Sequence, residues 1–249
     1  MTDPALYLHR LVLKDPLGLH RLARKMRLPD QPYDSDYIMH SLLTELLGPG
    51  QLRPFVVDPR SRGVAVLAYG RPDREKLEQK ARAVAPPEVF GQIDWTSTDS
   101  KPMPDVGAQG QHLGFRVRVS PVVRGPRGHG QDGAKIDKRS PEVDAYLASC
   151  WQQHEKPERE AVYRNWLTRE LGRDGAARPE TLRMTGFRLK RSLRRDGERK
   201  ARAITRPDAV FEGTLVIEES GAFGRLLERG LGRHRGFGFG MLLLTAPRN

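Results

Sequence analysis

The chain has 249 residues, with 43 Lys and Arg against 31 Asp and Glu, so its net charge is +12 and its isoelectric point is about 10.2. This charge favours a polyanionic partner, while 37% hydrophobic residues and 25 glycines exclude wholesale disorder. The single cysteine, Cys150, excludes a disulfide framework and a multi-thiolate zinc site, and no apolar stretch reaches the ~18 residues of a membrane span, so we expect a cytoplasmic protein.

The first 95 residues predict one mixed unit. Residues 6–13 form an apolar run before Asp15-Pro16, which is typical of a strand and a turn. Leucines spaced among basic residues then predict an amphipathic helix over 17–28, ended by Pro29. Further along we expect a helix at 35–47, strands at 53–57 and 64–69, a helix at 73–84 and a weaker strand at 89–95.

Residues 96–111 are polar and rich in Pro and Gly, which predicts a linker. The same order of elements then recurs over 112–249. The expected elements are a strand at 115–123, a Gly-rich basic loop at 124–140, helical segments over 141–172 with a break near 156–157, strands at 185–193 and 200–217, a helix at 222–229 with Ser220 as a possible cap, and a strand at 241–245. The prediction is an α+β fold of two tandem ferredoxin-like (RRM-like) βαββαβ domains, 1–95 and 112–249.

Most of the positive charge is concentrated in one predicted hairpin. Between residues 181 and 206 there are ten basic and two acidic residues, a net charge of +8 in 26 residues. A hairpin of this charge can enter a nucleic-acid groove or follow a phosphate backbone, although a basic run can also be only a solvated face. Its basic residues are Arg183, Arg188, Lys190, Arg191, Arg194, Arg195, Arg199, Lys200, Arg202 and Arg206.

A second, weaker basic candidate is the loop at 124–139, in which Lys138 and Arg139 are the candidate RNA contacts. Aromatic residues make up only 7% of the chain, so base stacking along a single strand is poorly supported. A structured duplex or an RNA hairpin fits this composition better.

Residues 230–240, GLGRHRGFGFG, form a segment that we call the glycine loop. Its Arg-Gly-Phe-Gly-Phe run matches five positions of the RNP1 motif, but Gly240 occupies the apolar position and too few residues follow for the rest of an RRM. The dinucleotide-binding fingerprint fails because the run precedes a strand, and the chain has no P-loop. Close backbone approach to phosphate and tight packing of a turn both remain as interpretations.

The spacing Gly230-Leu231-Gly232, five residues, Gly238-Phe239-Gly240 resembles the GhGxxxxxGhG loop of the RAMP proteins of CRISPR systems. With two ferredoxin-like units, a histidine in the first helix and a basic hairpin in the second unit, the whole chain resembles the CasE (Cse3) group of CRISPR RNA-processing endoribonucleases. The loop residues that this resemblance makes candidate RNA contacts are Gly230, Gly232, Arg233, His234, Arg235, Gly236, Gly238 and Gly240.

The resemblance implies a defined reaction. Such an enzyme binds the repeat hairpin of a CRISPR precursor RNA, cuts at the 3′ base of the stem, and leaves a 2′,3′-cyclic phosphate and a 5′-hydroxyl. It then stays on the mature guide RNA and joins the other subunits of the Cascade surveillance complex. No cofactor is expected.

The candidate catalytic residues lie in the first predicted helix. None of the seven histidines pairs with another at helical spacing, and Asp34, Ser35 and Asp36 are interpreted as helix-capping residues, so no metal motif is expected. Metal-free RNA cleavage needs a base for the 2′-hydroxyl proton, cations for the phosphate charge and an acid for the leaving oxygen. The resemblance places the catalytic histidine at His20, where Arg21, Arg24 and Lys25 add charge.

The family's tyrosine three residues before this histidine is Leu17 here. Leucine cannot transfer a proton, so the sequence leaves Lys25, Tyr37 and His40 as possible partners of His20. It also leaves open that the protein is a non-catalytic RNA-binding subunit of the same fold. A general basic RNA-binding protein, such as a ribosome-associated factor, is a third and weaker alternative.

Overall fold

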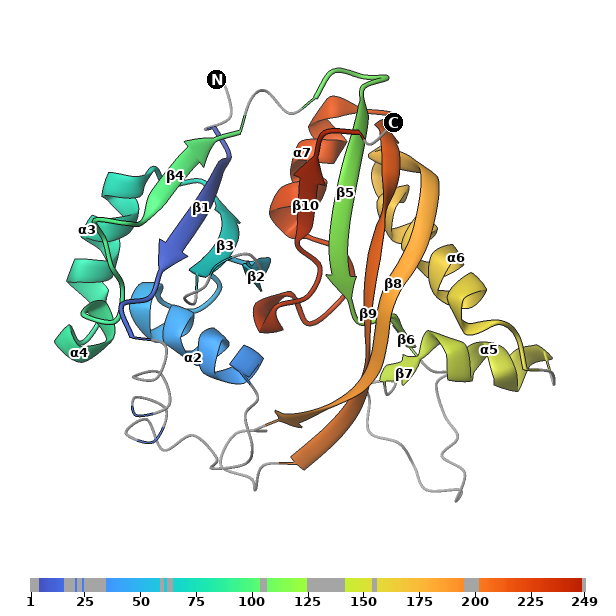
Figure 1. Ribbon diagram of the computed structural model, residues 1–249, viewed down its shortest axis with the longest axis horizontal. Coiled ribbons are helices and arrows are strands. Elements are labelled where there is room, and N and C mark those ends of the chain that lie inside the picture. Colours follow the sequence, from blue (N-terminus) through green and yellow to red (C-terminus); the bar gives the residue numbers. More distant parts are fainter. Residues whose placement is uncertain are drawn as a thin grey trace.

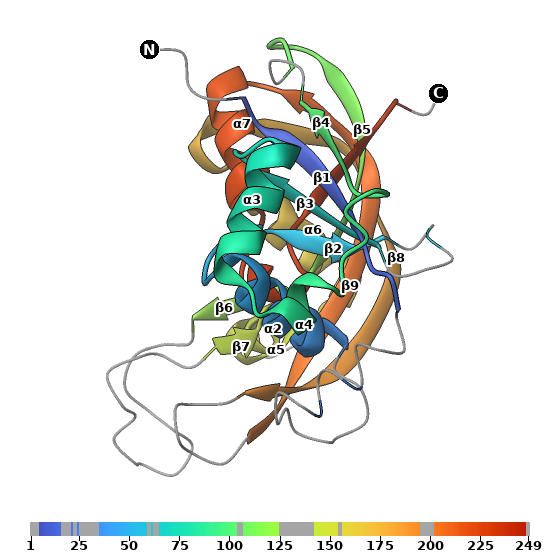
Figure 2. The same cartoon turned by 90° about the vertical axis from the view of Figure 1, so that its left-hand side faces the viewer.

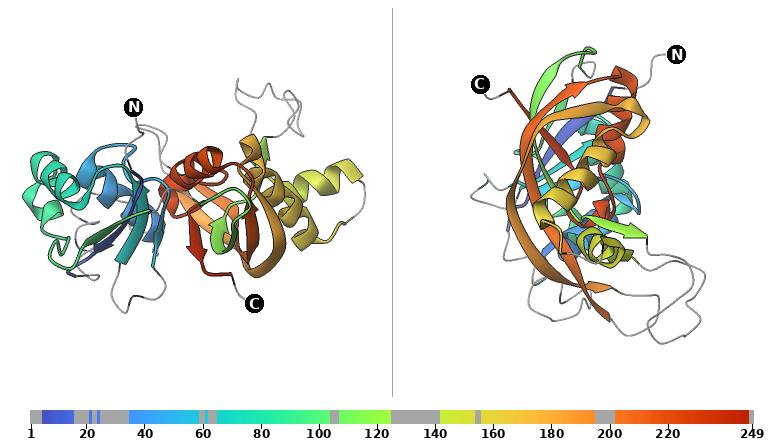
Figure 3. Two further views of the ribbon diagram at one scale, coloured as in Figure 1. Left: turned by 90° about the horizontal axis from the view of Figure 1, so that it is seen from above. Right: turned by 90° about the vertical axis from the view of Figure 1, so that its right-hand side faces the viewer.

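The computed structural model describes residues 5–15, 21, 24, 35–58, 61, 65–103, 107–124, 142–153, 156–194 and 202–247. Its described strands form two four-stranded antiparallel sheets, which stand side by side in Figure 1, and one small two-stranded sheet. Each large sheet belongs to one half of the chain. The two halves are seen from above in Figure 3.

The first sheet has the strand order β2-β3-β1-β4, which is that of a ferredoxin-like βαββαβ unit. Its core forms where leucines of the helix at Ser35–Leu47 pack on the strands; Leu11, Leu42, Leu46 and Phe55 are almost fully buried. The elements of this unit are β1 (Tyr7–Val12), α2 (Ser35–Leu47), β2 (Phe55–Val57), β3 (Ala65–Gly70), α3 (Arg74–Val84), α4 (Pro87–Phe90) and β4 (Asp99–Pro102).

The second sheet has the order β10-β5-β9-β8, so it repeats the topology of the first. Figure 2 shows α3 and α7 on the same side of the molecule, while β8 and β9 curve along the other side. Its elements are β5 (His112–Val119), β6 (Val122–Arg124), β7 (Glu142–Asp144), α5 (Ala145–Gln153), α6 (Arg159–Leu171), the short η1 (Arg173–Gly175), β8 (Ala177–Arg194), β9 (Arg202–Ile217), α7 (Ser220–Arg229), the short η2 (Arg235–Phe237) and β10 (Leu242–Thr245). The predicted fold class is therefore confirmed.

The two units share buried surface. Leu6 and Tyr69 of the first unit belong to the same apolar cluster as the core of the second. The Tyr69 hydroxyl donates to the Leu242 carbonyl oxygen at 2.9 Å, and Arg71 makes a two-pronged ion pair with Glu228 on α7. These contacts hold the two sheets in a fixed relative position, because apolar packing and directional hydrogen bonds act together.

Several sequence predictions are wrong, and one of them is the start of the helical segments over 141–172, where the structure has the strand β7. The strand expected at 89–95 is replaced by the short helix α4 and a single bridge between Ile93 and Leu13. The fourth strand is β4, which lies inside the segment predicted as a linker and pairs with β1. The cap of α7 is Glu219 rather than Ser220, and its carboxylate accepts the backbone N–H of Gly221 at 2.7 Å.

The predicted hairpin is present and longer than expected. β8 begins at Ala177 rather than near 185. Its pairing with β9 runs from the pair Ala177–Ile217 to the pair Arg194–Arg202. β9 continues unbroken through Pro207, which lies opposite Leu189 in the register. The paired strands extend beyond the neighbouring strand β5, as Figure 1 shows.

Candidate nucleic-acid interface

The basic hairpin, residues 183–206, is the largest candidate contact surface. Arg183 and Arg191 are exposed on β8 and free to meet an anion in solution. Arg188 is also 68% exposed, although its Nε donates to Asp208 at 2.8 Å. Lys190 differs, because only 13% of its side chain is exposed and its ammonium pairs with Asp36.

Of the other predicted residues in the hairpin, Arg194 and Arg202 lie opposite each other on the backbone, and Arg206 lies on β9. Arg195, Arg199 and Lys200 lie outside the described residues, as do Lys138 and Arg139 of the second basic loop. The described part of the hairpin therefore presents at least three exposed arginines on one strand.

Arg118 on β5 lies at the centre of an ion cluster that joins the two units. Its guanidinium donates to both carboxylate oxygens of Asp208 at 2.8 Å, and to the two oxygens of Asp36 at 3.2 and 3.0 Å. Its Cζ also lies 4.2 Å from the centre of the Phe239 ring. Asp36 was interpreted from the sequence as a helix-capping residue. It does lie in the first turn of α2, but its carboxylate also binds cations of the second unit.

The charges in this cluster compensate one another. Burial opposes the charge on Arg118, but hydrogen bonds to Asp208 and the charge of Asp36 outweigh it and raise the pKa of the guanidinium. Burial likewise opposes ionisation of Asp208, yet hydrogen bonds from Arg118 and Arg188 lower the pKa of that carboxyl. A buried charge is tolerated only when it is paired in this way, so the cluster fixes α2 against β5 and the hairpin.

The glycine loop is closed by backbone contacts. The Leu231 N–H donates to the Gly240 carbonyl oxygen at 2.8 Å, and the Gly240 N–H donates to the Arg118 carbonyl oxygen at 2.7 Å. Gly240 has φ +78°, and a Cβ there would overlap the Leu231 carbonyl oxygen. At Gly232, with φ +66°, a Cβ would lie 2.6 Å from the Trp166 ring. Glycine is required at both positions by backbone conformation and by close approach.

Most of these glycines face protein. Gly230, Gly236, Gly238 and Gly240 are buried, so the groups of the loop that reach outward are the side chains between them. Arg233 donates to Glu142 at 2.6 Å, and Nε2 of His234 lies 2.8 Å from the same carboxylate. Hydrogen bonds and positive charge from His234, and then from Arg233, lower the pKa of Glu142 to about 2. They outweigh burial, which acts in the opposite direction.

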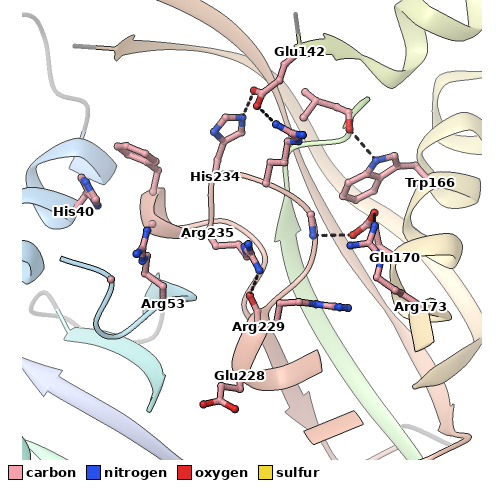
Figure 4. Close-up of a pocket in the computed structure, with 16 residues that line it drawn as sticks. His40, Arg53, Glu142, Trp166, Glu170, Arg173, Glu228, Arg229, His234 and Arg235 are labelled. Atoms are coloured by element: carbon pink, nitrogen blue, oxygen red, sulfur yellow. Dashed lines mark hydrogen bonds and ion pairs between the residues drawn. The ribbon is translucent and has the colours of Figure 1, made fainter. Parts of the chain in front are cut away.

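A cavity of about 770 Å³ opens beside this loop, between the two units (Figure 4). Its walls come from α2, the segment before β2, α6, the end of α7 and the loop itself. The residues lining it include His40, Arg53, Glu142, Trp166, Glu170, Arg173, Glu228, Arg229, His234 and Arg235. Nothing in the sequence pattern brought Arg53 and Arg173 together with the loop, because they lie far from it along the chain.

His40 on α2 lies beside the loop. Its ring centre is 4.4 Å from that of Phe237, and Tyr37 stacks on Phe237 at 6.2 Å. Burial and the charge of Arg53 lower the pKa of His40, although the Gly236 backbone partly opposes the shift. This shift favours the neutral imidazole, so His40 is a weaker candidate than an unperturbed histidine for donating a proton.

The predicted catalytic residues His20 and Lys25 lie outside the described residues. Arg21 and Arg24 are helical and exposed, and Arg21 pairs with Asp15 at 2.8 Å. Within the described part of the chain, no group of three or more His, Cys, Asp or Glu side chains is placed to hold a metal ion. No helix among the described residues has the length and hydropathy to cross a membrane.

The fold matches known structures along almost its whole length. Cse3 from Thermus thermophilus, bound to an RNA representing a pre-cleavage complex, has a TM-score of 0.60 at 20% identity and covers 97% of this chain and 99% of its own. Cas6e from Escherichia coli str. K-12 has a TM-score of 0.54 at 19% identity and covers 97% and 100%. At such identities the likeness establishes a shared fold.

A subunit of a CRISPR RNA-guided surveillance complex in a pre-nicking state is similar at the same level, with a TM-score of 0.54, 17% identity, and 97% and 100% coverage. Among curated proteins, none matches the sequence. A family model described as CRISPR associated protein matches residues 6–246, which include both ferredoxin-like units, the ion cluster and the glycine loop; the chain therefore belongs to this family of CRISPR-associated proteins.

Proposed function

We propose that this protein is an endoribonuclease that binds the repeat stem-loop of a CRISPR precursor RNA, cuts it at the 3′ base of the stem and keeps the product. The observation that carries the proposal is the basic hairpin, whose arginines project from the second unit of a fold shared with RNA-bound Cse3. Such a hairpin can follow the phosphates of a duplex stem, because each cation that meets a phosphate releases bound counterions.

The proposed reaction is a transesterification within the RNA. A base removes the proton of the 2′-hydroxyl, whose oxygen then forms a bond to the adjacent phosphorus. The bond from phosphorus to the 5′-oxygen breaks, and this oxygen takes a proton from an acid. The products are a 2′,3′-cyclic phosphate and a 5′-hydroxyl, with no change in oxidation state and no requirement for a metal ion.

We assign His20 as the proton-transferring residue and Lys25 as a cation that stabilises the charge on the phosphate. Among the alternative partners of His20, His40 is disfavoured as the acid, since burial and Arg53 lower its pKa. Tyr37 packs on Phe237 of the glycine loop, which directs its ring toward that loop. Lys25 therefore remains the first candidate for the acid role as well.

After cleavage, the proposal has the protein remain on the mature guide RNA as a subunit of Cascade. The likeness to a chain of a surveillance complex supports this role. Leu17, in place of a tyrosine, supports the alternative of a non-catalytic RNA-binding subunit. A general RNA-binding protein would bind repeat and unrelated hairpins equally.

The test is cleavage of a repeat RNA in EDTA, with the same RNA carrying a 2′-deoxy residue at the scissile position as its partner substrate. We expect the first to be cut and the second to resist. Cleavage that requires added magnesium would contradict the metal-free reaction, and cleavage of the 2′-deoxy substrate would contradict the 2′-hydroxyl as nucleophile. No cleavage of either RNA, with tight binding of both, would favour the non-catalytic alternative.

A further inference from the structure

The cavity beside the glycine loop is separate from the described part of the basic hairpin, none of whose residues lines it. Its volume of about 770 Å³ lies within the range of small-ligand sites. Five arginines and three glutamates contribute to its walls. The distribution of pairing among these charges determines what the cavity can bind.

The three glutamates are already engaged. Glu142 holds Arg233 and His234, and Glu170 holds Arg173 at 2.7 Å together with the backbone N–H of Gly232 at 3.1 Å. Glu228 is bound by Arg71, which lies outside the cavity lining. Little negative charge therefore remains to neutralise the other cations of the cavity.

Arg53 and Arg235 make no ion pair with a carboxylate within the described part of the chain, although the charge of Glu170 acts on Arg235 from farther away. Both side chains line the cavity in Figure 4, although Arg53 comes from the first unit and Arg235 from the second, and their charges act on each other. Arg235 donates to the Arg229 carbonyl oxygen at 2.6 Å, which uses only one of its donors. Burial, followed by the charges of Arg229 and Arg53, lowers the pKa of Arg235.

The Arg53 side chain is positioned by two glycines. A Cβ at Gly50, where φ is +85°, would lie 2.7 Å from Nη2 of Arg53, and a Cβ at Gly236 would lie 3.1 Å from its Cδ. The absence of side chains at these two positions lets the arginine pass closely between them. The Arg53 side chain thus reaches the wall of the cavity that Arg235 also lines.

We propose that this cavity binds a phosphate group of a nucleotide through Arg53 and Arg235. Two guanidinium groups offer parallel N–H donors that match phosphate oxygens, and a bound anion would relieve the repulsion between them. The phosphate can come from an unpaired segment of RNA next to the bound stem, in which case the inference rests on the proposed function. It can also come from a free nucleotide.

The test compares a blunt repeat hairpin with the same hairpin carrying an unpaired extension, across a range of salt concentrations. The variants are Arg53→Gln, Arg235→Gln and the double variant, with Arg225→Gln as the control because Arg225 is an exposed arginine of α7 outside the cavity. Binding of AMP and of inorganic phosphate is measured separately by calorimetry. Glutamine at 235 keeps a donor for the Arg229 carbonyl oxygen, and Arg53→Gln leaves that hydrogen bond intact.

We expect the extension to tighten binding by about tenfold, and the double variant to lose this gain together with about 0.7 in the slope of log K against log salt, because one phosphate of an unpaired strand is no longer neutralised. Blunt-hairpin binding should not change in any of these variants. If the extension has no effect but AMP binds and the double variant abolishes it, the phosphate belongs to a free nucleotide and the site still stands. If the double variant and Arg225→Gln bind the extended hairpin equally well and also bind AMP equally well, the inference is wrong. Failure of the blunt hairpin to bind the native protein would instead contradict the proposed function.

Discussion

Arg118 on β5 and Asp36 on α2 form an ion pair, with Nη2 and Oδ2 3.0 Å apart, that joins the second ferredoxin-like unit to the first. Asp36 also binds Lys190 of the basic hairpin. The segment that carries His20 enters α2 directly before this aspartate. The cluster thus links the hairpin that we propose to hold RNA with the helix that follows the proposed catalytic residue.

Arg118→Ala should destabilise the protein by about 3–5 kcal/mol, because it leaves Asp36 and Asp208 buried without their main partner. Arg116→Ala is a matched control two positions earlier on β5. Its ion pair with Glu212 is half exposed, so that loss should cost less than about 1 kcal/mol. Urea unfolding of both variants measures the difference, and equal costs would show that the cluster contributes no more than a surface pair.

Gly240→Ala should cost about 3 kcal/mol or more, because the added Cβ overlaps the Leu231 carbonyl oxygen in a residue with φ +78°. Gly110→Ala separates the two effects, since Gly110 has φ +82° but no atom within 4 Å of an added Cβ. Its cost should be only the left-handed backbone penalty of about 1–2 kcal/mol. If thermal unfolding finds the two alanine variants equally stable, close approach is not the reason for glycine at 240.

His9 should make the protein less stable as the pH falls from about 6.5 to about 4. Its ring is fully buried, with Nδ1 2.7 Å from the Ser100 hydroxyl oxygen, and burial lowers its pKa to about 4. Since the unfolded chain binds the proton more readily, the neutral ring stabilises the fold above the unfolded pKa, and this stability is lost as the pH falls through the folded pKa. The size of the effect is about 3 kcal/mol at most.

The measurement is urea unfolding of the native protein and of His9→Gln at several pH values, with His112→Gln as an exposed control. His9→Gln should lose less stability between pH 6.5 and 4 than the native protein, whatever its stability at neutral pH. NMR titration of the imidazole gives a direct reading of the same group. A His9 ring that titrates near 6.5 would contradict the prediction.

The topology could be predicted because the spacing of apolar residues indicates which residues are buried. The buried residues were predicted correctly even where the type of element was wrong. Val89, Ile93 and Trp95 are buried as expected of a strand, yet Val89 lies on a short helix, Ile93 in a single bridge and Trp95 in a turn. The true strand β4 is the mostly exposed edge DSKP, whose pairing with β1 leaves no apolar alternation to detect.

The site was less predictable than the fold. Local charge density identified the hairpin, and glycine spacing identified the loop, since both are properties of contiguous residues. Lys190 shows the limit of this reasoning, because its neighbours in sequence do not reveal that its ammonium pairs with Asp36, 154 positions away. Arg53 entered no motif at all, and only the folded chain brings it to the same cavity as Arg235.

Arg183→Gln and Arg191→Gln should each weaken binding of a repeat hairpin and reduce the salt slope by about 1, because each is an exposed arginine available to a phosphate. Arg178→Gln is the control on the same strand, since Arg178 lies before the basic run and pairs with Glu218. Fluorescence anisotropy at several salt concentrations gives both readouts. A loss of binding as large in Arg178→Gln would mean that total charge, rather than the hairpin, determines affinity.

His20→Ala should slow cleavage of the repeat RNA by about 10²- to 10⁴-fold, the usual contribution of a residue that transfers a proton in the transition state. Binding of uncleaved RNA should change little, because the hairpin arginines are untouched. His112→Ala is the matched control, because this histidine is the first residue of β5, is exposed and is bound to Glu180. Single-turnover cleavage with excess protein separates the chemical step from release of the product. Unchanged cleavage in His20→Ala would move the catalytic role to another residue, whereas cleavage absent from the native protein as well would identify a subunit that only binds RNA.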